Sequence, residues 1–523
     1  MTAEHRTSTE TQSTQAQSNV RDSFDEVAFE SPAAAAPDEQ SFTDKQQSTP
    51  HAALPLCVDL DGTLVKSDTL LDSLCVLARK RPAVLLRAPA WLAGGKANLK
   101  REVTARAPLE VAHLPYNTAL ILYLREQAAT GRRLYLSTGA DHALADRVAK
   151  YLGVFDGVFA SDGRTNLTGA RKLRLLEERF GRDGFVYVGN SRADLPLLQV
   201  SAGAMLANPD AGLQSRLRRK NIAVQNVFED RAPVAASLWR TLRIHQWAKN
   251  VLIFLPLLLA HSLTMGKLLQ SVIAFFSFCL VASSTYILND LLDLASDRGH
   301  ASKRRRPFAA GDLSALFGAG LAAVLFACGI LISLPLAPKF LIWLLIYVAV
   351  TLAYSLYCKR IVIVDVIILS ALYTLRILAG AAAAQVAISA WMAGFAVFFF
   401  FSLALVKRFS ELENLRIRGA VPSNDRGYFV QDMEQLRAFG TASAFASIVV
   451  FTLYINNPDV SRLYHHPQRL WLLTPLLIWW LSRVWLRASR GQMNEDPVVF
   501  ALTDPASLLS GVMIFLIALF ASL

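Results

Sequence analysis

YILNDLLDLASDRGHASKRRRP, residues 286–307, is the stretch of this sequence that decides its fold. It follows an apolar run long enough to cross a membrane, and its acidic residues recur at spacings of three, four and seven. These spacings place Asp290, Asp293 and Asp297 on one face of a helix, beside Asn289. Carboxylates crowded at the end of a membrane span repel one another unless a divalent cation lies between them. The pattern therefore predicts a metal site at the membrane surface.

A basic cluster, Lys303–Arg306, follows the acidic residues at once. Acids that bind a cation beside bases that bind phosphate predict a site for a magnesium-bound diphosphate. The alternative is a helix end whose charges are simply solvated.

The composition predicts a membrane protein with more than one domain. The chain has 523 residues, of which 53% are hydrophobic, and the apolar residues concentrate after about residue 240. The net charge of +12 is typical of basic cytoplasmic loops that face anionic headgroups, so we expect no nucleic-acid partner. The five cysteines are scattered without a metal-binding or disulfide pattern.

The expected fold class is multidomain, with an α/β Rossmann-like domain followed by an all-α integral membrane bundle. Residues 1–50 are polar, and we expect a disordered tail there rather than a signal peptide. Strand-like runs at 56–60, 133–137, 184–188 and 204–207 alternate with helical stretches, which predicts a parallel sheet in residues 54–229. Aromatic and basic residues interleave in 230–246, as in an amphipathic interfacial linker.

The membrane domain, residues 247–523, is expected to contain nine spans. They lie near 247–263, 269–289, 313–333, 339–357, 361–383, 389–407, 437–456, 469–487 and 504–522. With nine spans, the basic loops all fall on one face, which the positive-inside rule makes cytoplasmic. We therefore expect a multi-pass protein of the cell (inner) membrane with a cytoplasmic N-terminal domain.

Five motifs of the membrane domain, in order, resemble the UbiA superfamily of intramembrane prenyltransferases. Within it, they are most similar to decaprenyl-phosphate phosphoribosyltransferases. The motifs are RIHQWAKN (243–250), the acidic motif with KRRRPFAAG (303–311), YSLYCKR (354–360), LRILAG (375–380) and KRFSEL (407–412). The resemblance implies that Asn289, Asp290, Asp293 and Asp297 hold Mg²⁺, with Asp290 and Asp293 essential for catalysis.

One segment departs from ordinary prenyltransferases, which carry a second Asp-rich motif after the sixth span. Here that position holds Lys407, Arg408 and Glu411. The departure matches the phosphoribosyltransferase branch and implies phosphoribosyl pyrophosphate as donor and a polyprenyl phosphate as acceptor. The alternative is an aromatic prenyltransferase that uses a polyprenyl diphosphate; a transporter is disfavoured because no inverted repeat of broken helices is evident.

Further polar residues of the membrane domain are candidates for phosphate binding. Lys303, Arg304 and Arg306 suit the phosphates of the donor. Lys249 and Lys407 either contact phosphate or extend to the membrane interface. Arg376 lies deep in a span, where a charge is usually functional, and Asp365 lies three helical turns earlier on the same face. Tyr354, Lys359, Arg408 and Glu411 complete the candidate set; Asp365 either serves the metal or caps a helix.

The α/β domain resembles the haloacid-dehalogenase-like (HAD) phosphatases, with a helical cap in residues 67–132. LCVDLDGTL (56–64) matches the first motif, which makes Asp59 the nucleophile and Asp61 the general acid/base. Ser137 and Thr138 match the second motif and would bind phosphate, and Lys172 matches the third. GNSRADLP (189–196) matches the fourth, so that Asp59, Asp61 and Asp194 would hold Mg²⁺.

Asn190 departs from the fourth motif, which usually has Asp at this position. A neutral oxygen binds magnesium more weakly than a charged one, which leaves two alternatives, an active phosphatase and a degenerate binding domain. The fusion suggests that the phosphatase removes the 5-phosphate from the lipid product of the membrane domain, which would give polyprenyl-phosphoryl ribose.

Overall fold

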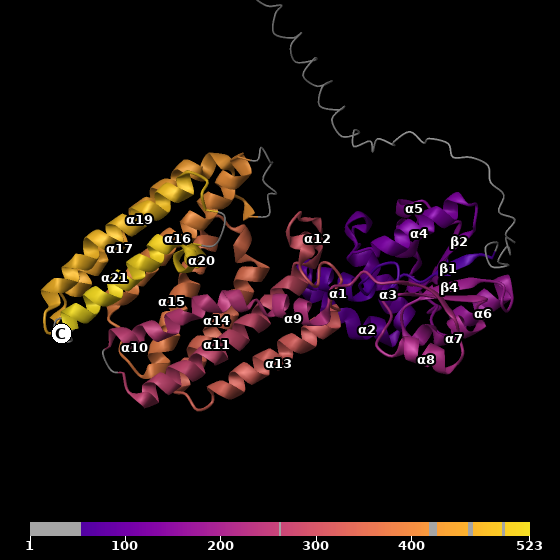
Figure 1. Cartoon of the computed structure of the whole chain (residues 1–523), viewed down its shortest axis with the longest axis horizontal. Helices are drawn as coiled ribbons and strands as arrows, with labels where there is room; N and C mark the ends of the chain where they lie inside the picture. Colours follow the sequence, from indigo (N-terminus) through magenta and orange to yellow (C-terminus); the bar gives the residue numbers. More distant parts are fainter. Residues whose placement is uncertain (1–53, 261–262, 418–425, 459–463, 494–496, 523) are drawn as a thin grey trace, which may run out of the picture. The chain divides into compact units, whose positions relative to one another are not determined.

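The computed structural model describes residues 54–260, 263–417, 426–458, 464–493 and 497–522 (Figure 1). The tail predicted for residues 1–50 lies outside these residues. The described chain contains an α/β domain, which begins at β1, and a helical bundle, which ends at α21. Both parts of the predicted fold class are confirmed.

The α/β domain contains a six-stranded parallel sheet in the order β3-β2-β1-β4-β5-β6. The strands are β1 (Leu56–Val58), β2 (Leu134–Asp141), β3 (Gly157–Ser161), β4 (Val186–Gly189), β5 (Gly203–Ala207) and β6 (Val224–Phe228). Sequence patterns located β1, β2, β4 and β5. The two strands that they missed lie at the edges of the sheet, where one side is unpaired and the hydrophobic run is shorter.

Alternate residues of β1 enter separate hydrophobic cores on the two faces of the sheet. Leu56 and Val58 pack in one core, beneath α4 (Thr118–Ala129) and α5 (His142–Leu152). Cys57 packs in the other, beneath α6 (Ala170–Phe180), α7 (Leu195–Val200) and α8 (Leu213–Arg219) (Figure 1). This alternation is the two-residue period of a strand buried on both faces.

The segment expected to form the cap is helical. It contains α1 (Thr69–Lys80), α2 (Ala88–Ala93), α3 (Lys96–Arg106) and α4. Asp68 caps the start of α1, since its carboxylate accepts hydrogen bonds from the backbone N–H groups of Leu70 and Leu71. The helix ends before Pro82, which cannot continue it.

The bundle begins after α9 (Val234–Leu242), which occupies most of the predicted linker. Its remaining α-helices are α10 (Leu255–Leu259), α11 (Met265–Leu292), α12 (Leu294–Gly299), α13 (Ala315–Ser333), α14 (Pro338–Leu356), α15 (Val364–Ala384), α16 (Ala390–Ile417), α17 (Met433–Ile455), α19 (Leu473–Ser489), α20 (Pro497–Thr503) and α21 (Pro505–Ser522). The boundaries between the predicted domains stay predictions.

Among the described residues, seven helices are long and apolar enough to cross a membrane, whereas nine spans were expected. The expected first span contains a 3₁₀ segment, Ile244–Phe254, followed by the short α10. Pro256 lies in the first turn of α10, where its missing N–H is tolerated, and this divides the apolar run. The expected eighth span contains α19, whose 17 residues include Arg483 and Arg487. Both segments are therefore shorter than the apolar runs suggested.

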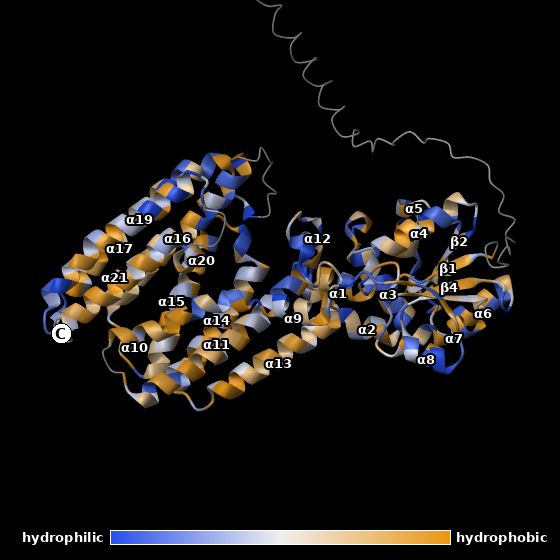
Figure 2. Ribbon diagram, in the orientation of Figure 1, coloured by the Kyte–Doolittle hydropathy of each residue, from blue (hydrophilic) through white to orange (hydrophobic). Residues whose placement is uncertain are grey.

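The outer helices of the bundle expose apolar side chains, as lipid-facing helices do. Only 17% of the apolar window of α13 is buried within the protein, and Val324 and Leu331 are 58% and 62% exposed. Figure 2 shows that α13 and α21 are hydrophobic over most of their length. Such surfaces are stable in a bilayer and aggregate in water, so the chain is a multi-pass membrane protein.

Candidate active sites

In the α/β domain, the nucleophile, lysine and acid expected from the motifs lie together at the carboxyl edge of the sheet. The Lys172 ammonium lies 2.8 Å from Asp59 and 4.0 Å from Asp194. Lys172 also donates to the Tyr187 hydroxyl over 3.1 Å, and this hydroxyl donates to Asp194 over 3.0 Å. All four side chains are buried. Two carboxylates that converge on one cation form a donor set that suits Mg²⁺.

Asp61 belongs to the segment between β1 and α1, and its side chain contacts the start of α1. Its carboxylate accepts a hydrogen bond from the Thr69 backbone N–H over 2.8 Å. Burial raises the pKa of Asp61 to about 7, and the nearby Asp68 charge adds to this shift. Burial also raises the pKa of Asp59 to about 6, although the Lys172 ammonium opposes that shift. Burial thus favours the neutral form of both carboxyls and brings their pKa values toward neutral pH, where acid–base catalysis needs them.

Ser137 and Asn190 border the same site. Val58 pairs with Leu136 across the sheet, so the residues that follow them, Asp59 and Ser137, are neighbours. The Ser137 hydroxyl is buried and has no hydrogen-bond partner among the described residues, which suits a phosphate ligand. Asn190 packs against Gly62, whose φ of +77° and lack of a Cβ allow this close approach.

Two further observations complete the phosphatase-like site. The Thr138 hydroxyl accepts a hydrogen bond from the Ala140 N–H over 3.0 Å, within the part of β2 where its register with β3 shifts. Lys100 of α3 donates to the Gly139 carbonyl and, over 3.0 Å, to Asn166. Sequence reasoning missed Lys100, because nothing in the sequence relates a cap helix to the second motif.

In the bundle, each acid of the acidic motif has a basic partner. Asp290 lies 2.5 Å from Arg243 and 3.1 Å from Arg306. The same Arg306 nitrogen lies 2.7 Å from Asp297. Asp293 lies 2.6 Å from Lys359. Burial raises the pKa of Asp297 to about 6, although the Arg306 guanidinium opposes the shift.

The fit of these acids to Mg²⁺ is mixed. In the parts of the chain that the structure describes, no three acidic, His or Cys side chains are grouped closely enough to hold a metal ion. Asp290 and Asp297 nevertheless converge on one Arg306 nitrogen, which occupies the place of a cation between two carboxylates. A hard cation suits these oxygen ligands, and Arg306 is then available to contact an anion that arrives with it.

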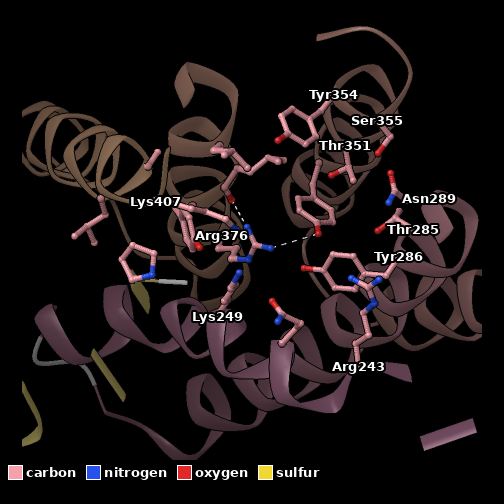
Figure 3. Close-up of a pocket in the computed structure, with 18 of the residues that line it drawn as sticks. Arg243, Lys249, Thr285, Tyr286, Asn289, Thr351, Tyr354, Ser355, Arg376 and Lys407 are labelled. Carbon is pink, nitrogen blue, oxygen red and sulfur yellow. Dashed lines mark hydrogen bonds between the residues drawn. The ribbon is translucent and has the colours of Figure 1, made fainter. Parts of the chain in front are cut away.

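A cavity of about 310 Å³ opens beside the acidic motif. Figure 3 shows Lys249, Arg376 and Lys407 on one side of it and Arg243, Thr285 and Asn289 on the other. Seven predicted site residues line it, namely Lys249, Asn289, Arg306, Tyr354, Arg376, Lys407 and Arg408. Its cationic lining, in a membrane-embedded bundle, suits a polyanionic substrate.

Arg376 is held in the cavity wall by aromatic and amide groups. Its Nε donates to Asn250 over 2.9 Å, and its Nη2 donates to the Tyr347 hydroxyl over 3.4 Å. Its guanidinium lies 5.0–5.5 Å from the ring centroids of Phe278, Tyr347 and Tyr373. Cation–π contacts stabilise a desolvated arginine and fix its orientation.

Arg408 forms a buried network where prenyltransferases carry their second acidic motif. It lies 2.5 Å from both Asp365 and Glu411, and it donates to the Tyr354 hydroxyl over 3.2 Å. Tyr428 also donates to Asp365. Asp365 is fully buried, so Arg408 neutralises its charge.

A second cavity, of about 240 Å³, lies beside the first. It is lined by the predicted residues Asn289, Asp293, Asp297, Lys303, Arg306, Tyr354 and Lys359. Asp290, Arg304, Asp365 and Glu411 line neither cavity. Arg304 is exposed, in the middle of the 3₁₀ turn Lys303–Arg305.

Two basic residues that line the first cavity, Arg243 and Arg426, were absent from the sequence-based site. Arg243 has φ of +51° where α9 ends, and this turn directs its side chain to Asp290. Its place in the RIHQWAKN motif was the available signal. Arg426 lies 3.0 Å from Glu411, and no pattern in its own loop indicated that contact.

Comparisons with known proteins found relatives of the chain. The model of the UbiA prenyltransferase family matches residues 250–504. An uncharacterized protein of Sinorhizobium fredii, y4nM, is 40% identical over 464 residues, 88% of this chain and 90% of that protein. Since 464 residues exceed the length of the bundle alone, that relative shares both domains. The α/β domain is similar to a HAD-family hydrolase of Salmonella enterica serovar Typhi, with 14% identity, coverage of 35% of this chain and 69% of that one, and a TM-score of 0.26.

A relative of named activity covers the bundle. The decaprenyl-phosphate phosphoribosyltransferase of Mycolicibacterium smegmatis is 32% identical over 236 residues, 43% of this chain and 72% of that enzyme. The family match, this relative and the acidic motif at the cavity agree, and the chain therefore belongs to the UbiA prenyltransferase family.

Proposed function

We propose that the bundle transfers 5-phosphoribose from phosphoribosyl pyrophosphate to a polyprenyl phosphate in a magnesium-dependent reaction. The observation that carries this proposal is the pairing of Arg408 with Asp365 and Glu411. A prenyl diphosphate site uses acids at this position to hold further metal. Here Asp365 and Glu411 line neither cavity, and the surrounding cavities carry an excess of Lys and Arg. That balance suits a donor with more phosphate groups.

The named activity of the Mycolicibacterium relative supports the same donor and acceptor. An apolar cavity of about 330 Å³ adjoins the site, with Leu252, Leu255, Phe395 and Phe399 in its wall. Leu403 lines both this cavity and the polar one. A lipid acceptor placed there would extend its prenyl chain among apolar side chains while its phosphate meets Lys249 and Arg376.

In this reaction the bond between ribose C1 and the pyrophosphate oxygen breaks, and a bond forms from C1 to an oxygen of the lipid phosphate. Magnesium held by Asp290, Asp293 and Asp297 would neutralise charge on the leaving pyrophosphate. Arg306 and Lys303 would bind the same anion, and Arg376 and Lys249 would orient the acceptor. The acceptor oxygen is already anionic, so no strong general base is needed. The tasks of the chain are positioning and the exclusion of water.

We further propose that the α/β domain removes the 5-phosphate from the lipid product. The Asp59 carboxylate would attack phosphorus while Asp61 donates a proton to the departing ribose oxygen. Water activated by Asp61 would then hydrolyse the phosphoaspartate and release inorganic phosphate. The buried cluster of Asp59, Lys172 and Asp194 supports this assignment. A domain that binds phosphate without turnover is the alternative, because Asn190 supplies a neutral oxygen.

The basic loops indicate the side of the membrane on which the reaction would take place. The loops with Lys303–Arg306 and Lys359–Arg360 flank the cavities, and basic loops face the cytoplasm. We therefore place both active sites on the cytoplasmic side of the cell membrane, where soluble phosphorylated sugars are available.

A donor exchange tests the proposed transfer. Membranes that contain the protein are incubated with magnesium and either labelled phosphoribosyl pyrophosphate plus polyprenyl phosphate, or labelled polyprenyl diphosphate plus an aromatic acceptor. The proposal expects a new labelled lipid product only in the first reaction, and none with Asp290→Asn. Product only in the second reaction would instead identify an aromatic prenyltransferase.

A further inference from the structure

One helix of the α/β domain, α1, contacts both candidate active sites. At its first residue, the Thr69 N–H donates to Asp61 over 2.8 Å. Near its other end, the Arg79 guanidinium lies 3.7 Å from Asp293 of the acidic motif. Arg79 also donates to the backbone carbonyls of Ser355 and Leu356 in α14, the latter over 2.9 Å. A helix of 12 residues, about 18 Å long, therefore joins the two sites.

A buried ion pair fixes the orientation of α1. Asp72 lies 2.8 Å from Arg298, the residue that follows Asp297, and both side chains are at most 5% exposed. Arg298 also donates to the Ser67 hydroxyl over 3.0 Å. Asp72 and Arg79 are seven residues apart, so they lie on one face of α1, and that face meets the acidic motif. Buried ion pairs of this kind act mainly on specificity of packing, which is here the position of Arg79.

The position of α1 places its last turn in the wall of the second cavity. Val76, Arg79 and Lys80 line this cavity from α1, opposite residues of the bundle. Seven Lys or Arg side chains line it against two acids, Asp293 and Asp297. Asp293 is shared between Arg79 and Lys359, so its single charge cannot neutralise both. A partly enclosed cavity with this excess of positive charge attracts phosphate groups.

The two cavities are neighbours, since Asn289, Arg306, Tyr354 and Arg426 line both. Its two acids belong to the motif that would hold magnesium. An anion in this cavity would therefore meet both the metal ligands and the cations of α1. A magnesium-bound diphosphate requires both, acids for its metal ion and cations for its phosphates.

We infer that the transferase site is completed by the α/β domain, and that Arg79 is a substrate-binding residue for the pyrophosphate end of the donor. The inference rests on the proposed transfer reaction for the identity of the donor. Lys80 adds charge at the rim of the same cavity. The α/β domain thus has a second role in the first reaction, besides the chemistry at Asp59.

Steady-state kinetics of full-length variants test this role. Arg79→Met is expected to raise the KM for phosphoribosyl pyrophosphate and the inhibition constant of pyrophosphate at least tenfold. The KM for polyprenyl phosphate should stay within twofold, because that substrate binds in the other cavity. Arg79→Lys keeps the charge and should recover much of the loss. Arg81→Met, an exposed arginine two residues further on, should behave as wild type.

A structural role of Arg79 would give another pattern. If Arg79 only holds the domains together, Arg79→Met would raise both KM values alike. That result would overturn the inference, as would an unchanged pyrophosphate inhibition constant. Comparable elution profiles and melting temperatures of the purified variants show that each one folds.

Direct binding of pyrophosphate keeps the inference separate from the identity of the donor. Pyrophosphate leaves in either candidate reaction, so calorimetry with magnesium pyrophosphate needs no knowledge of the substrate. Wild-type protein is expected to bind it at least tenfold more tightly than Arg79→Met. If no lipid is formed from phosphoribosyl pyrophosphate but this difference persists, the proposed donor is wrong and the role of Arg79 stands. Equal binding by the two proteins would refute that role.

Discussion

Arg408 of α16 and Asp365 of α15 form a buried ion pair with a separation of 2.5 Å, and their side chains are 2% and 0% exposed. The pair lies where prenyltransferases carry their second acidic motif. Asp365 is fully buried and lines neither cavity, so it is not placed to hold a metal ion beside a substrate. This arrangement is consistent with the proposed donor, which carries more phosphate, and with a metal site built from one acidic motif.

Removal of Arg408 should destabilise the bundle. Arg408→Met leaves Asp365 buried with the Tyr428 hydroxyl as its main partner, and an uncompensated buried charge costs about 3–5 kcal/mol. Thermal unfolding in detergent should show a clearly lower melting temperature. Arg437→Met is the matched control, because that arginine is exposed on α17 and its loss should leave the melting temperature close to wild type.

The double variant Arg408→Met/Asp365→Asn removes both charges. It should be more stable than Arg408→Met alone, because no unpaired carboxylate remains. Equal melting temperatures for the double and single variants would show that the ion pair is not what holds this part of the bundle.

Transfer should depend on magnesium and on the acidic motif. We expect EDTA to abolish transfer and added magnesium to restore it. Asp290→Asn and Asp297→Asn should each lower kcat/KM about 100-fold or more, the usual scale for the loss of a metal ligand or its charge. Asp146→Asn, on the surface of α5, serves as control. Full activity of both motif variants in EDTA would contradict the proposed mechanism.

Transfer should require the arginine side chain at position 376 and not only its positive charge. Arg376→Met removes the central cation of the first cavity, and Arg376→Lys cannot donate to both Asn250 and Tyr347. Both variants should lower kcat/KM at least tenfold, about 1.4 kcal/mol. Lys339→Met replaces an exposed lysine at the start of α14 and should retain activity. Normal activity of Arg376→Lys would show that charge alone suffices.

Asn190→Asp should strengthen magnesium binding in the α/β domain. The substitution restores a charged oxygen beside Asp59 and Asp194 at nearly the same volume. Half-maximal release of phosphate from a model phosphoester should then occur at a lower magnesium concentration than in wild type. An unchanged magnesium dependence would place Asn190 outside the metal site.

Much of this fold follows from local patterns. The strands β1, β2, β4 and β5 are buried on both faces and are therefore continuous apolar runs. The edge strands β3 and β6 lack that signal, and their positions depend on pairing across the sheet. The sequence also did not predict the 3₁₀ segment before α10, because hydropathy gives the length of an apolar run and not its division at Pro256.

The sequence likewise indicated some of the candidate site residues and not others. The sequence indicated Asp59, Lys172 and Asp194, and the structure brings them together, because strand order fixes which ends are adjacent. It could not indicate that Arg306 lies between Asp290 and Asp297, since this depends on how the basic turn folds back. Arg79 lies more than 200 residues from Asp293 in the chain, and only tertiary packing relates them.

The most direct test of the central claim uses phosphoribosyl pyrophosphate labelled with ¹⁴C in the ribose and ³²P in the 5-phosphate. Membranes with wild-type protein, polyprenyl phosphate and magnesium should yield a lipid with ¹⁴C and little ³²P, together with labelled inorganic phosphate. Asp59→Asn should yield a lipid that retains both labels in equal proportion. Absence of ¹⁴C from the lipid in both reactions, with the acceptor and magnesium present, would contradict the proposed transfer.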